Sequence, residues 1–484
     1  MSAMLDSEHS EWRKSLIRPS RFAWLLPITI LVGAYLGRAS LGPNAPFLDV
    51  LNVTMASILV LTIRGLPRRS AWLWAATLVL ISGGFLQLFW LSYQLKIDPA
   101  YIPTNLPDIA WLSPSDIYGA YLELTALFSV FVVVAALLVH FGPSPRFDLN
   151  PQHVGPAFKR WIAGGTAVYA AATLLQIALG FGLYGTATAT LPFHSNTIIS
   201  FYRQELFPSM LLLGVWVFDK GSTRWRHACI FGLGGVAAVE AYVSTSRGTL
   251  ITYGVPLLFL WFILGRFTKS RKVLVVLGLV AYLLFTPVLS AIRLDRLSSA
   301  HVISGVVRPE DYALAQSLDR SLIRVGGAEG ILVARHYGQQ LGFAGVVDAL
   351  SPNTLILYYT YNVIGLPKDT PLADFRAPAA LGVAVLVGGD VGAVGMWLVL
   401  LALFAAGWSW ILRCGMSWPV GCALFCGAIA SYFSEGGVVI IYKYALAFLA
   451  VELLYRHLRP RPPEPQTSDS GGANTGQSAR LSSR

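Results

Sequence analysis

The chain has 484 residues, of which 55% are hydrophobic and only 13% carry a charge. So few charged side chains cannot cover a soluble protein of this length with polar surface, which argues against a water-soluble globular protein. The net charge of +11 would suit a nucleic-acid-binding protein, but the Lys and Arg residues are distributed among many loops. We therefore predict an all-α polytopic membrane protein that binds the lipid bilayer and no nucleic acid.

Long apolar runs recur along the chain, and each can cross about 30 Å of hydrocarbon as a helix. They are apolar on every face, whereas the strands of a membrane β-barrel are shorter and alternate. The first run is too long and too aromatic for a cleaved signal peptide, so we expect it to be retained. The predicted spans, about twelve, are 22–37, 47–63, 71–94, 117–140, 161–185, 205–218, 228–245, 249–265, 273–291, 391–412, 416–431 and 438–455.

The basic residues predict the orientation of these spans. Short loops rich in Lys and Arg stay in the cytoplasm, and a cytoplasmic N-terminus puts every short basic cluster on that side. The clusters are Arg64, Arg68 and Arg69; Arg146, Lys159 and Arg160; Lys220, Arg224 and Arg226; Arg266, Lys269, Arg271 and Lys272; Arg413; and Arg456, Arg459 and Arg461. Both termini are therefore predicted to be cytoplasmic, with an even number of crossings.

One outer loop is much longer than a connector needs to be, and long structured loops on a rigid scaffold often carry function. We expect short helices within it. The C-terminal tail has almost no apolar residues and is predicted to be disordered. The predicted organisation is a cytoplasmic N-terminus (1–21), spans 1 to 9 (22–291), the long periplasmic loop (292–378), a re-entrant segment with spans 10 to 12 (379–455), and a cytoplasmic tail (456–484).

The basic residues predicted on the outer face are mostly arginine. A guanidinium group matches phosphate oxygens two at a time, so this bias suits a phosphate ligand. The long loop has as many acidic as basic residues, so its arginines can instead be ion-paired at a wet surface, where a pair contributes only about 0 to 1 kcal/mol. The outer arginines are Arg38, Arg203, Arg247, Arg293, Arg296, Arg308, Arg320, Arg324, Arg335 and Arg376.

Positive charge is concentrated in the middle of the long loop. Arg320 and Arg324 stand four residues apart, on one face of a predicted helix that ends at two glycines before Arg335 and His336. Only two acidic residues, Asp319 and Glu329, oppose these arginines. This stretch is the predicted anion site of the loop.

Two further arginines lie where the chain meets the membrane. Arg247 lies in the turn Ser246-Arg247-Gly248. Its guanidinium is desolvated there unless it binds an anion or a backbone carbonyl group, or extends to the membrane interface. Arg376 precedes a glycine-rich apolar run in which a short half-helix can offer its N-terminus to a phosphate, although an ordinary start of a span is the alternative.

Three charges fall within predicted spans or at their edges: Glu240, Glu435 and Lys443. Charges there are costly, so each is expected to face a partner or a wet cavity. Glu435 can pair with Lys443, and either glutamate can instead reach an acceptor hydroxyl.

The sequence lacks the motifs of several enzyme classes. It contains no P-loop, no H-E-x-x-H, no G-x-S-x-G and no D-x-D, which argues against nucleotide-driven or zinc-dependent chemistry. The four cysteines lie in or beside spans, and Cys422 and Cys426 share a helix face without His or acidic neighbours, which favours packing over metal binding. We predict no metal and no cofactor, and a substrate that arrives already activated, such as a lipid-linked diphosphate.

Several motifs together resemble the O-antigen polymerase (Wzy) and ligase superfamily. They are Ser246-Arg247-Gly248 at the start of a span, R-x-G-G-x-E-G-x-x-x-x-R-H at 324–336, and F-R-A-P followed by G-G-D-V-G-A-V-G at 375–395. The resemblance extends over most of residues 20–455. It implies a bacterial inner-membrane glycosyltransferase with a GT-C-like helical fold, which transfers a glycan from undecaprenyl diphosphate to the next lipid-linked repeat unit without a metal.

The resemblance also implies roles for residues and partners. Arginines bind the diphosphate and stabilise the charge that develops as it leaves, and a histidine or glutamate positions or deprotonates the acceptor. The catalytic candidates are Arg247, Arg324, Arg335, His336 and Glu329, and the substrate-binding candidates are Arg203, Arg320, Arg376 and Glu435. The implied partners are a polyprenyl-diphosphate-linked oligosaccharide, a chain-length regulator and a flippase.

Two other functions stay open at this point. An O-antigen ligase uses the same donor but transfers the glycan to lipid A-core. A transporter or flippase of an anionic or lipid-linked substrate would bind it with the same arginines, although a carrier should place its critical charges near the membrane centre.

The predicted topology can be tested with reporter fusions. A green fluorescent protein fused after the tail should fluoresce, and alkaline phosphatase at the same place should be inactive, because both termini are predicted to be cytoplasmic. Phosphatase inserted within 292–378 should be active. An active phosphatase at the C-terminus would contradict the even number of crossings.

Overall fold

The structure is a computed structural model, and it describes residues 71–79, parts of 116–137, 154–180, 195–219, 221–244, 248–265, 268–299, 328–337, 379–435 and 439–459. All regular secondary structure in these residues is helical, which confirms the all-α prediction for this part of the chain. The predicted spans 22–37 and 47–63, most of the long loop and both termini lie outside the described residues.

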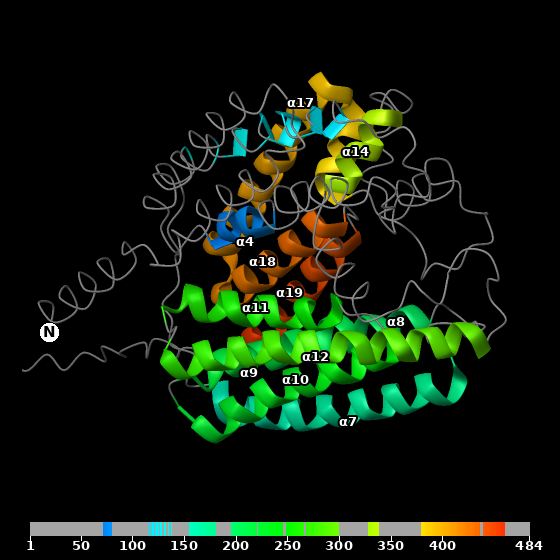
Figure 1. Cartoon of the computed structure of the whole chain (residues 1–484). Helices are drawn as coiled ribbons and strands as arrows, with labels where there is room; N and C mark the ends of the chain where they lie inside the picture. Colours follow the sequence, from blue (N-terminus) through cyan, green and yellow to red (C-terminus); the bar gives the residue numbers. More distant parts are fainter. Residues whose placement is uncertain are drawn as a thin grey trace, which may run out of the picture.

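The helices follow the chain in the order shown in Figure 1. They are α4 (Ala71–Val79), α7 (Gly155–Leu179), α8 (Ser195–Phe201), the π-helical turn η8 (Tyr202–Leu206), α9 (Phe207–Val217), α10 (Thr223–Ser244), α11 (Gly248–Ile263), α12 (Lys269–Ser299), α14 (Ala328–Tyr337), α17 (Ala379–Cys414), α18 (Trp418–Glu435) and α19 (Val439–Leu458). The described residues between 116 and 137 are also helical.

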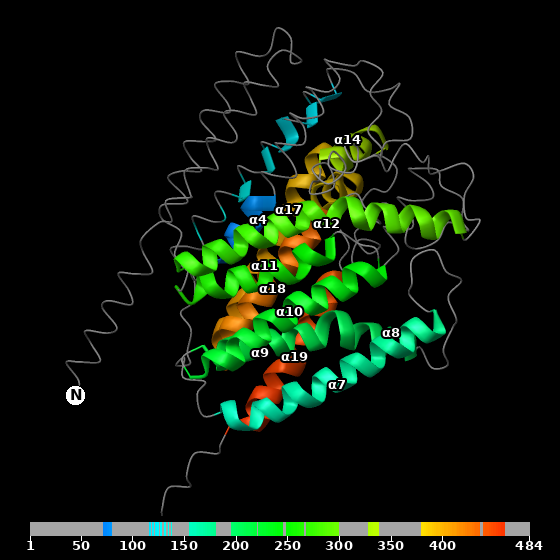
Figure 2. The ribbon, with the colours of Figure 1, turned by 60° about the horizontal axis from the view of Figure 1, so that its bottom comes forward.

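Helix α18 forms the centre of the bundle and contacts α4, α9, α11, α17 and α19 (Figure 1). Its small residues allow neighbouring helices to approach closely, which is typical of packing between membrane helices. A Cβ atom at Gly427 would lie only 2.6 Å from Pro256 of α11, and one at Gly421 would clash with Phe448 of α19. In the second view, α7, α9 and α10 lie together below α18 (Figure 2).

Two of the described helices are long and apolar enough to cross a membrane: Gly155–Leu179 and the Gly392–Cys414 part of α17. Large apolar side chains on α7, such as Leu174, and on α12, such as Leu277 and Leu284, are exposed on the outside of the bundle. Many large exposed apolar side chains on a helix indicate contact with a membrane or with another protein. Length, composition and exposed surface together indicate membrane association, while the number and direction of the crossings stay predictions.

The boundaries of α7 differ from the predicted span 161–185. The helix begins at Gly155, where Pro156 occupies the first turn and its missing N–H costs nothing. It ends at Leu179 because Gly180 adopts a left-handed conformation (φ 69°) and closes the helix. The prediction was wrong here because the sequence stays apolar beyond this glycine.

Two other helices also depart from a simple span. Helix α12 continues to Ser299, beyond the predicted end of span 9 at 291. Helix α17 is broken at Gly389, whose φ of 61° and ψ of −168° are not helical. A short buried helix therefore precedes the long apolar one, in the segment where the sequence predicts a half-helix.

The ends of three helices meet at Glu452 of α19. Its two carboxylate oxygens accept hydrogen bonds from the N–H groups of Met416 and Ser417, both at 2.9 Å, and from the Ser417 hydroxyl at 2.6 Å. Arg456 donates to the same carboxylate at 2.7 Å and to the carbonyl oxygen of Cys414 at 2.8 Å. This buried carboxylate thus caps the start of α18 and fixes the end of α17.

A second cluster joins α9 to α12. Arg271 donates to Asp219 at 2.9 Å, and its guanidinium lies 5.3 Å from the centre of the Trp261 ring. Arg226 lies 3.7 Å from the same carboxylate. Two arginines of the predicted cytoplasmic clusters therefore have a structural role as well as a topological one.

We expect Glu452→Ala to destabilise the protein by about 2 to 4 kcal/mol, because two backbone N–H groups and a hydroxyl lose a buried acceptor at about 1 kcal/mol or more each. Thermal unfolding of the purified protein in detergent measures the effect as a lower Tm. Leu453→Ala is the matched control, since Leu453 is the next residue of the helix and is 67% exposed. Equal Tm values for the two variants would contradict the capping role.

Candidate functional site

The centre of the candidate site is an ion pair between Arg203 and Glu240. Their side chains are 0% and 1% exposed, and Nη2 of Arg203 lies 2.5 Å from Oε1 of Glu240. The hydroxyl of Tyr169 donates to the same carboxylate oxygen at 3.0 Å, and Gln204 Nε2 lies 3.5 Å from the other oxygen. The Arg203 guanidinium lies 5.6 Å from the centre of the Tyr169 ring. Three segments, α7, η8 and α10, thus meet at one carboxylate.

Arg203 is placed by the π-helical turn η8, between α8 and α9. Pro208 lies at the start of α9. Proline has no N–H to donate to the carbonyl group four residues earlier, that of Gln204, and its ring crowds that carbonyl. The preceding turn therefore widens, and single π-turns inside helices are frequent at functional sites.

The guanidinium group of Arg203 is only partly satisfied. Nε and Nη1 are buried and have no hydrogen-bond partner among the described residues. Arginine cannot lose its proton to avoid this cost, and a buried donor without a partner costs about 1 to 3 kcal/mol. Two donors on one planar group are suited to a phosphate or another oxygen-rich ligand.

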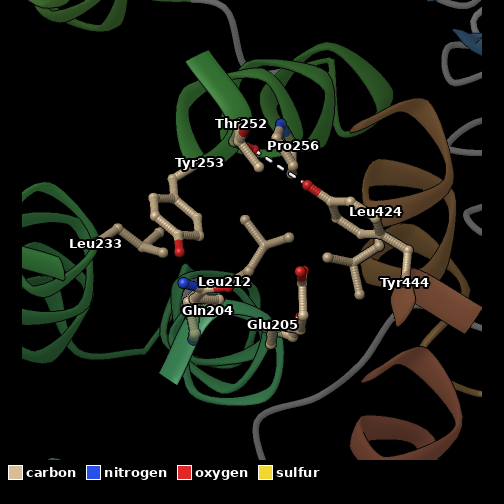
Figure 3. A pocket seen from close by; sticks show the side chains of 11 residues that line it. Gln204, Glu205, Leu212, Leu233, Thr252, Tyr253, Pro256, Leu424 and Tyr444 are labelled. Atoms are coloured by element: carbon tan, nitrogen blue, oxygen red, sulfur yellow. Dashed lines mark hydrogen bonds between the residues drawn. The ribbon is translucent and has the colours of Figure 1, made fainter. Parts of the chain in front are cut away.

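Figure 3 shows a pocket that is lined in part by Gln204. Because Gln204 Nε2 also lies 3.5 Å from Glu240, the pocket is next to the ion pair. Its empty space, with the open mouth included, is about 270 Å³, and the enclosed part has room for about one water-sized group. The lining residues come from η8, α9, α10, α11, α18 and α19: Gln204, Glu205, Pro208, Ser209, Leu212, Leu233, Thr252, Tyr253, Pro256, Leu424 and Tyr444.

The pocket combines an apolar wall with several polar groups. Leu212, Leu233 and Leu424 form the apolar part, and Glu205 adds a carboxylate. The hydroxyl of Tyr444 donates to the carbonyl oxygen of Thr252 at 3.4 Å, at one edge of the pocket (Figure 3). A pocket with a carboxylate and hydroxyl groups suits a hydroxyl-bearing or cationic ligand, whereas the neighbouring Arg203 suits an anion.

The predicted topology puts this pocket in the outer half of the membrane. The turn η8 begins just before predicted span 205–218, and Thr252 is an early residue of span 249–265. Tyr444 lies early in span 438–455, which also starts on the outer side. A substrate that approaches from the outer face would therefore reach the pocket mouth before the middle of the bilayer.

Of the site residues predicted from the sequence, Arg203 lies at this site. Glu240, which was expected to need a partner because a charge inside the membrane is costly, is paired with Arg203. Arg335 lies elsewhere, on α14, with Nη1 3.1 Å from Oε2 of Glu123. His336 is the exposed residue beside it. Helix α14 packs along α17, away from α8 and α9 in both views (Figures 1 and 2). Arg203 and Arg335 therefore belong to two separate clusters.

The other predicted site residues lie outside the described part of the chain or have side chains outside it. Glu329 is the second residue of α14 and Glu435 is the last residue of α18, but their side chains are not among those described. The positions outside the described residues are Arg247, Arg320, Arg324 and Arg376.

The sequence analysis did not single out Tyr169, Gln204 or Glu205. A signal for the last two exists, because Arg203-Gln204-Glu205 is an uninterrupted polar run at the start of the predicted span 205–218. Tyr169 carries no such signal, since one tyrosine among apolar residues is typical of a membrane helix.

Comparison of the chain with protein-family models, with curated proteins and with solved structures finds no match. The resemblance to the polymerase and ligase superfamily therefore stays a prediction from sequence motifs.

We expect Arg203→Met and Glu240→Met each to lower the stability by about 3 to 5 kcal/mol, because each leaves the other charge buried and unpaired. The double variant should recover most of this loss, since it buries no charge. Chemical unfolding of the four proteins in the same detergent gives the coupling energy. Losses that simply add in the double variant would show that the two side chains do not form a pair.

Proposed function

We propose that this chain polymerises undecaprenyl-diphosphate-linked oligosaccharide repeat units, as a glycosyltransferase on the periplasmic side of the bacterial inner membrane. The product would be an O-antigen, capsule or exopolysaccharide. The observation that carries the proposal is Arg203, a buried guanidinium with two donors unpartnered among the described residues, beside a polar pocket. The motifs of the polymerase and ligase superfamily support the same class of reaction.

Arg203 has the chemistry that a diphosphate leaving group requires. Its pair with Glu240 fixes the guanidinium plane, so Nε and Nη1 are held ready for phosphate oxygens. Preorganised charge in a water-poor site stabilises a developing anion much more than the same charge in water. Glu240 offsets part of the charge, and the net attraction comes from the two remaining donors together with other arginines.

In the proposed reaction the acceptor hydroxyl attacks the anomeric carbon of the donor, and the bond from that carbon to the diphosphate oxygen breaks. The electron pair leaves with the diphosphate, where arginine charge stabilises it and no metal is needed. Arg247, Arg320, Arg324, Arg335 and Arg376 are the further proposed diphosphate ligands. His336, Glu329 and Glu435 are the proposed contacts for the acceptor or the glycan.

One observation favours the alternative of a transporter. A buried acid–base pair beside a pocket, at a depth inside the predicted spans, is also a feature of carriers that bind an ion or solute within the membrane. The ligase alternative shares the donor and the arginine chemistry with the polymerase, and the acceptor is what separates the two.

The purified protein should convert a lipid-linked repeat unit into a ladder of longer glycans. Arg203→Ala should lower kcat about 10²- to 10³-fold, the usual cost of one lost donor to a developing anion, while Lys269→Gln, a change at an exposed residue of the predicted cytoplasmic side, serves as the control. A single product on lipid A-core would identify a ligase. Solute flux without any glycan product would contradict both enzymes.

A further inference from the structure

We propose that the starts of α7 and α10 together bind the headgroup of an anionic phospholipid. Lys159 and Arg160 lie in the second turn of α7, and Arg224 lies in the first turn of α10. The ammonium nitrogen of Lys159 lies 5.7 Å from the centre of the Trp225 ring, so the two helix starts meet at this contact. Arg160 and Arg224 are the chain neighbours of the two contacting residues. Three cations from two helices are therefore gathered at one place.

The acidic residue described at this end of the bundle is already shared by two other arginines. Within the described parts of 154–161 and 219–228, Asp219 is the acidic residue. It accepts a hydrogen bond from Arg271 at 2.9 Å, and Nη1 of Arg226 lies 3.7 Å from it. Neither α7 nor α10 has an acidic residue in its first turn, although the positive end of a helix favours one. The three cations therefore outnumber the described carboxylates around them and attract anions.

Exposed apolar side chains continue from these charges along both helices. On α7, the exposed residues Trp161, Val168 and Leu175 recur at seven-residue intervals, so they lie on one face that begins at the basic end of the helix. On α10, Phe231 is 73% exposed and lies two helical turns after Arg224 on the same face. A tryptophan with basic residues at the start of an apolar helix is typical of the level where phospholipid headgroups meet the hydrocarbon.

The combination of charge and apolar surface favours an amphiphile over other anions. Inorganic phosphate or a nucleic acid would neutralise the cations but would leave the apolar faces exposed to water. An anionic phospholipid covers both, because its headgroup meets the three cations while its acyl chains lie along the apolar faces. Two of the cations are arginines, whose fork of donors matches phosphate oxygens in pairs. In the predicted topology this lipid belongs to the cytoplasmic leaflet, so the site does not depend on the proposed reaction.

A headgroup at this position would join two helices that both pack against α9. The buried ring of Phe218, directly after α9, contacts the rings of Phe158 on α7 and Trp225 on α10, with centres 6.2 Å and 5.9 Å away. A phosphate that binds Lys159 and Arg224 at once would connect the same two helix starts on their polar side. The lipid should therefore stabilise the protein, as any ligand of the folded state does.

The test titrates the full-length protein, in a neutral detergent, with phosphatidylglycerol, phosphatidylcholine or inorganic phosphate. Native mass spectrometry measures binding, and thermal unfolding measures Tm. Phosphatidylglycerol should bind most tightly and raise Tm most. Each cation lost near a membrane surface lowers the affinity about fivefold, so Lys159→Gln and Arg224→Gln should each show this loss, while Lys159→Arg should bind like the wild type. Arg413→Gln is the control, since Arg413 is an exposed arginine of the same predicted side, at the end of α17.

Three results would overturn the proposal. Equal affinity of the wild type for the two phospholipids would show that the charge of the headgroup is not recognised. Inorganic phosphate that raises Tm as much as phosphatidylglycerol would identify a site for a small anion instead of a lipid. A lower Tm of Lys159→Gln without any change in its preference for phosphatidylglycerol would show that this cation only holds the two helices together. An equal loss of affinity in Arg413→Gln would assign the effect to surface charge in general.

Discussion

The arrangement around the candidate site depends on one constraint, the burial of Arg203 and Glu240 inside an apolar bundle. A buried pair gains little stability over apolar residues of similar size, because both charges lose their hydration. It does impose strong geometric requirements, since breaking the pair leaves one charge alone. Helices α7 and α10 and the turn η8 must therefore keep their relative positions, and the polar groups of Tyr169 and Gln204 contribute to holding them.

The two ends of the bundle differ in how their charged groups are bonded. At the predicted cytoplasmic end, Glu452 accepts hydrogen bonds from two backbone N–H groups, a hydroxyl and Arg456, and Asp219 receives Arg271. At the predicted outer end, Arg203 keeps two nitrogens without a described partner beside a pocket. Fully bonded carboxylates favour one fixed arrangement of the helices. Glu452 and Asp219 therefore anchor the predicted cytoplasmic end, while the two unpartnered nitrogens of Arg203 lie toward the predicted outer end.

The sequence predicted the positions of several helices well, for physical reasons. Helices α10, α11, α18 and α19 begin and end close to the predicted spans because basic residues or glycines bound each apolar run. The end of α7 at Gly180 was missed because one glycine within an apolar run does not reveal its left-handed backbone. The π-turn was also missed, since nothing in the local sequence of Tyr202–Leu206 distinguishes a widened turn from an ordinary helical one.

The candidate site was predictable only in part. Glu240 looked costly in the membrane, so the sequence required a partner for it without saying which, whereas Arg203 was predicted as an arginine of the outer face and a candidate for substrate binding. Their pairing depends on the packing of α10 against the segment of η8 and α9, which no local pattern encodes. Glu205 entered only when the structure placed it in the pocket with residues of α11 and α19.

The second cluster, Arg335 with Glu123, has different energetics from the first. The two side chains are 29% and 7% exposed, so solvent screens the attraction and the pair is worth little compared with a fully buried one. Glu123 is nevertheless buried, so loss of Arg335 would leave a buried carboxylate without its cation, which is costly. The half-exposed guanidinium of Arg335 can keep part of its hydration, whereas that of Arg203 cannot. The two ion pairs therefore constrain different parts of the bundle: the buried pair holds η8 and α7 against α10, while the partly exposed pair holds α14, which packs along the broken α17, to the helical segment that carries Glu123.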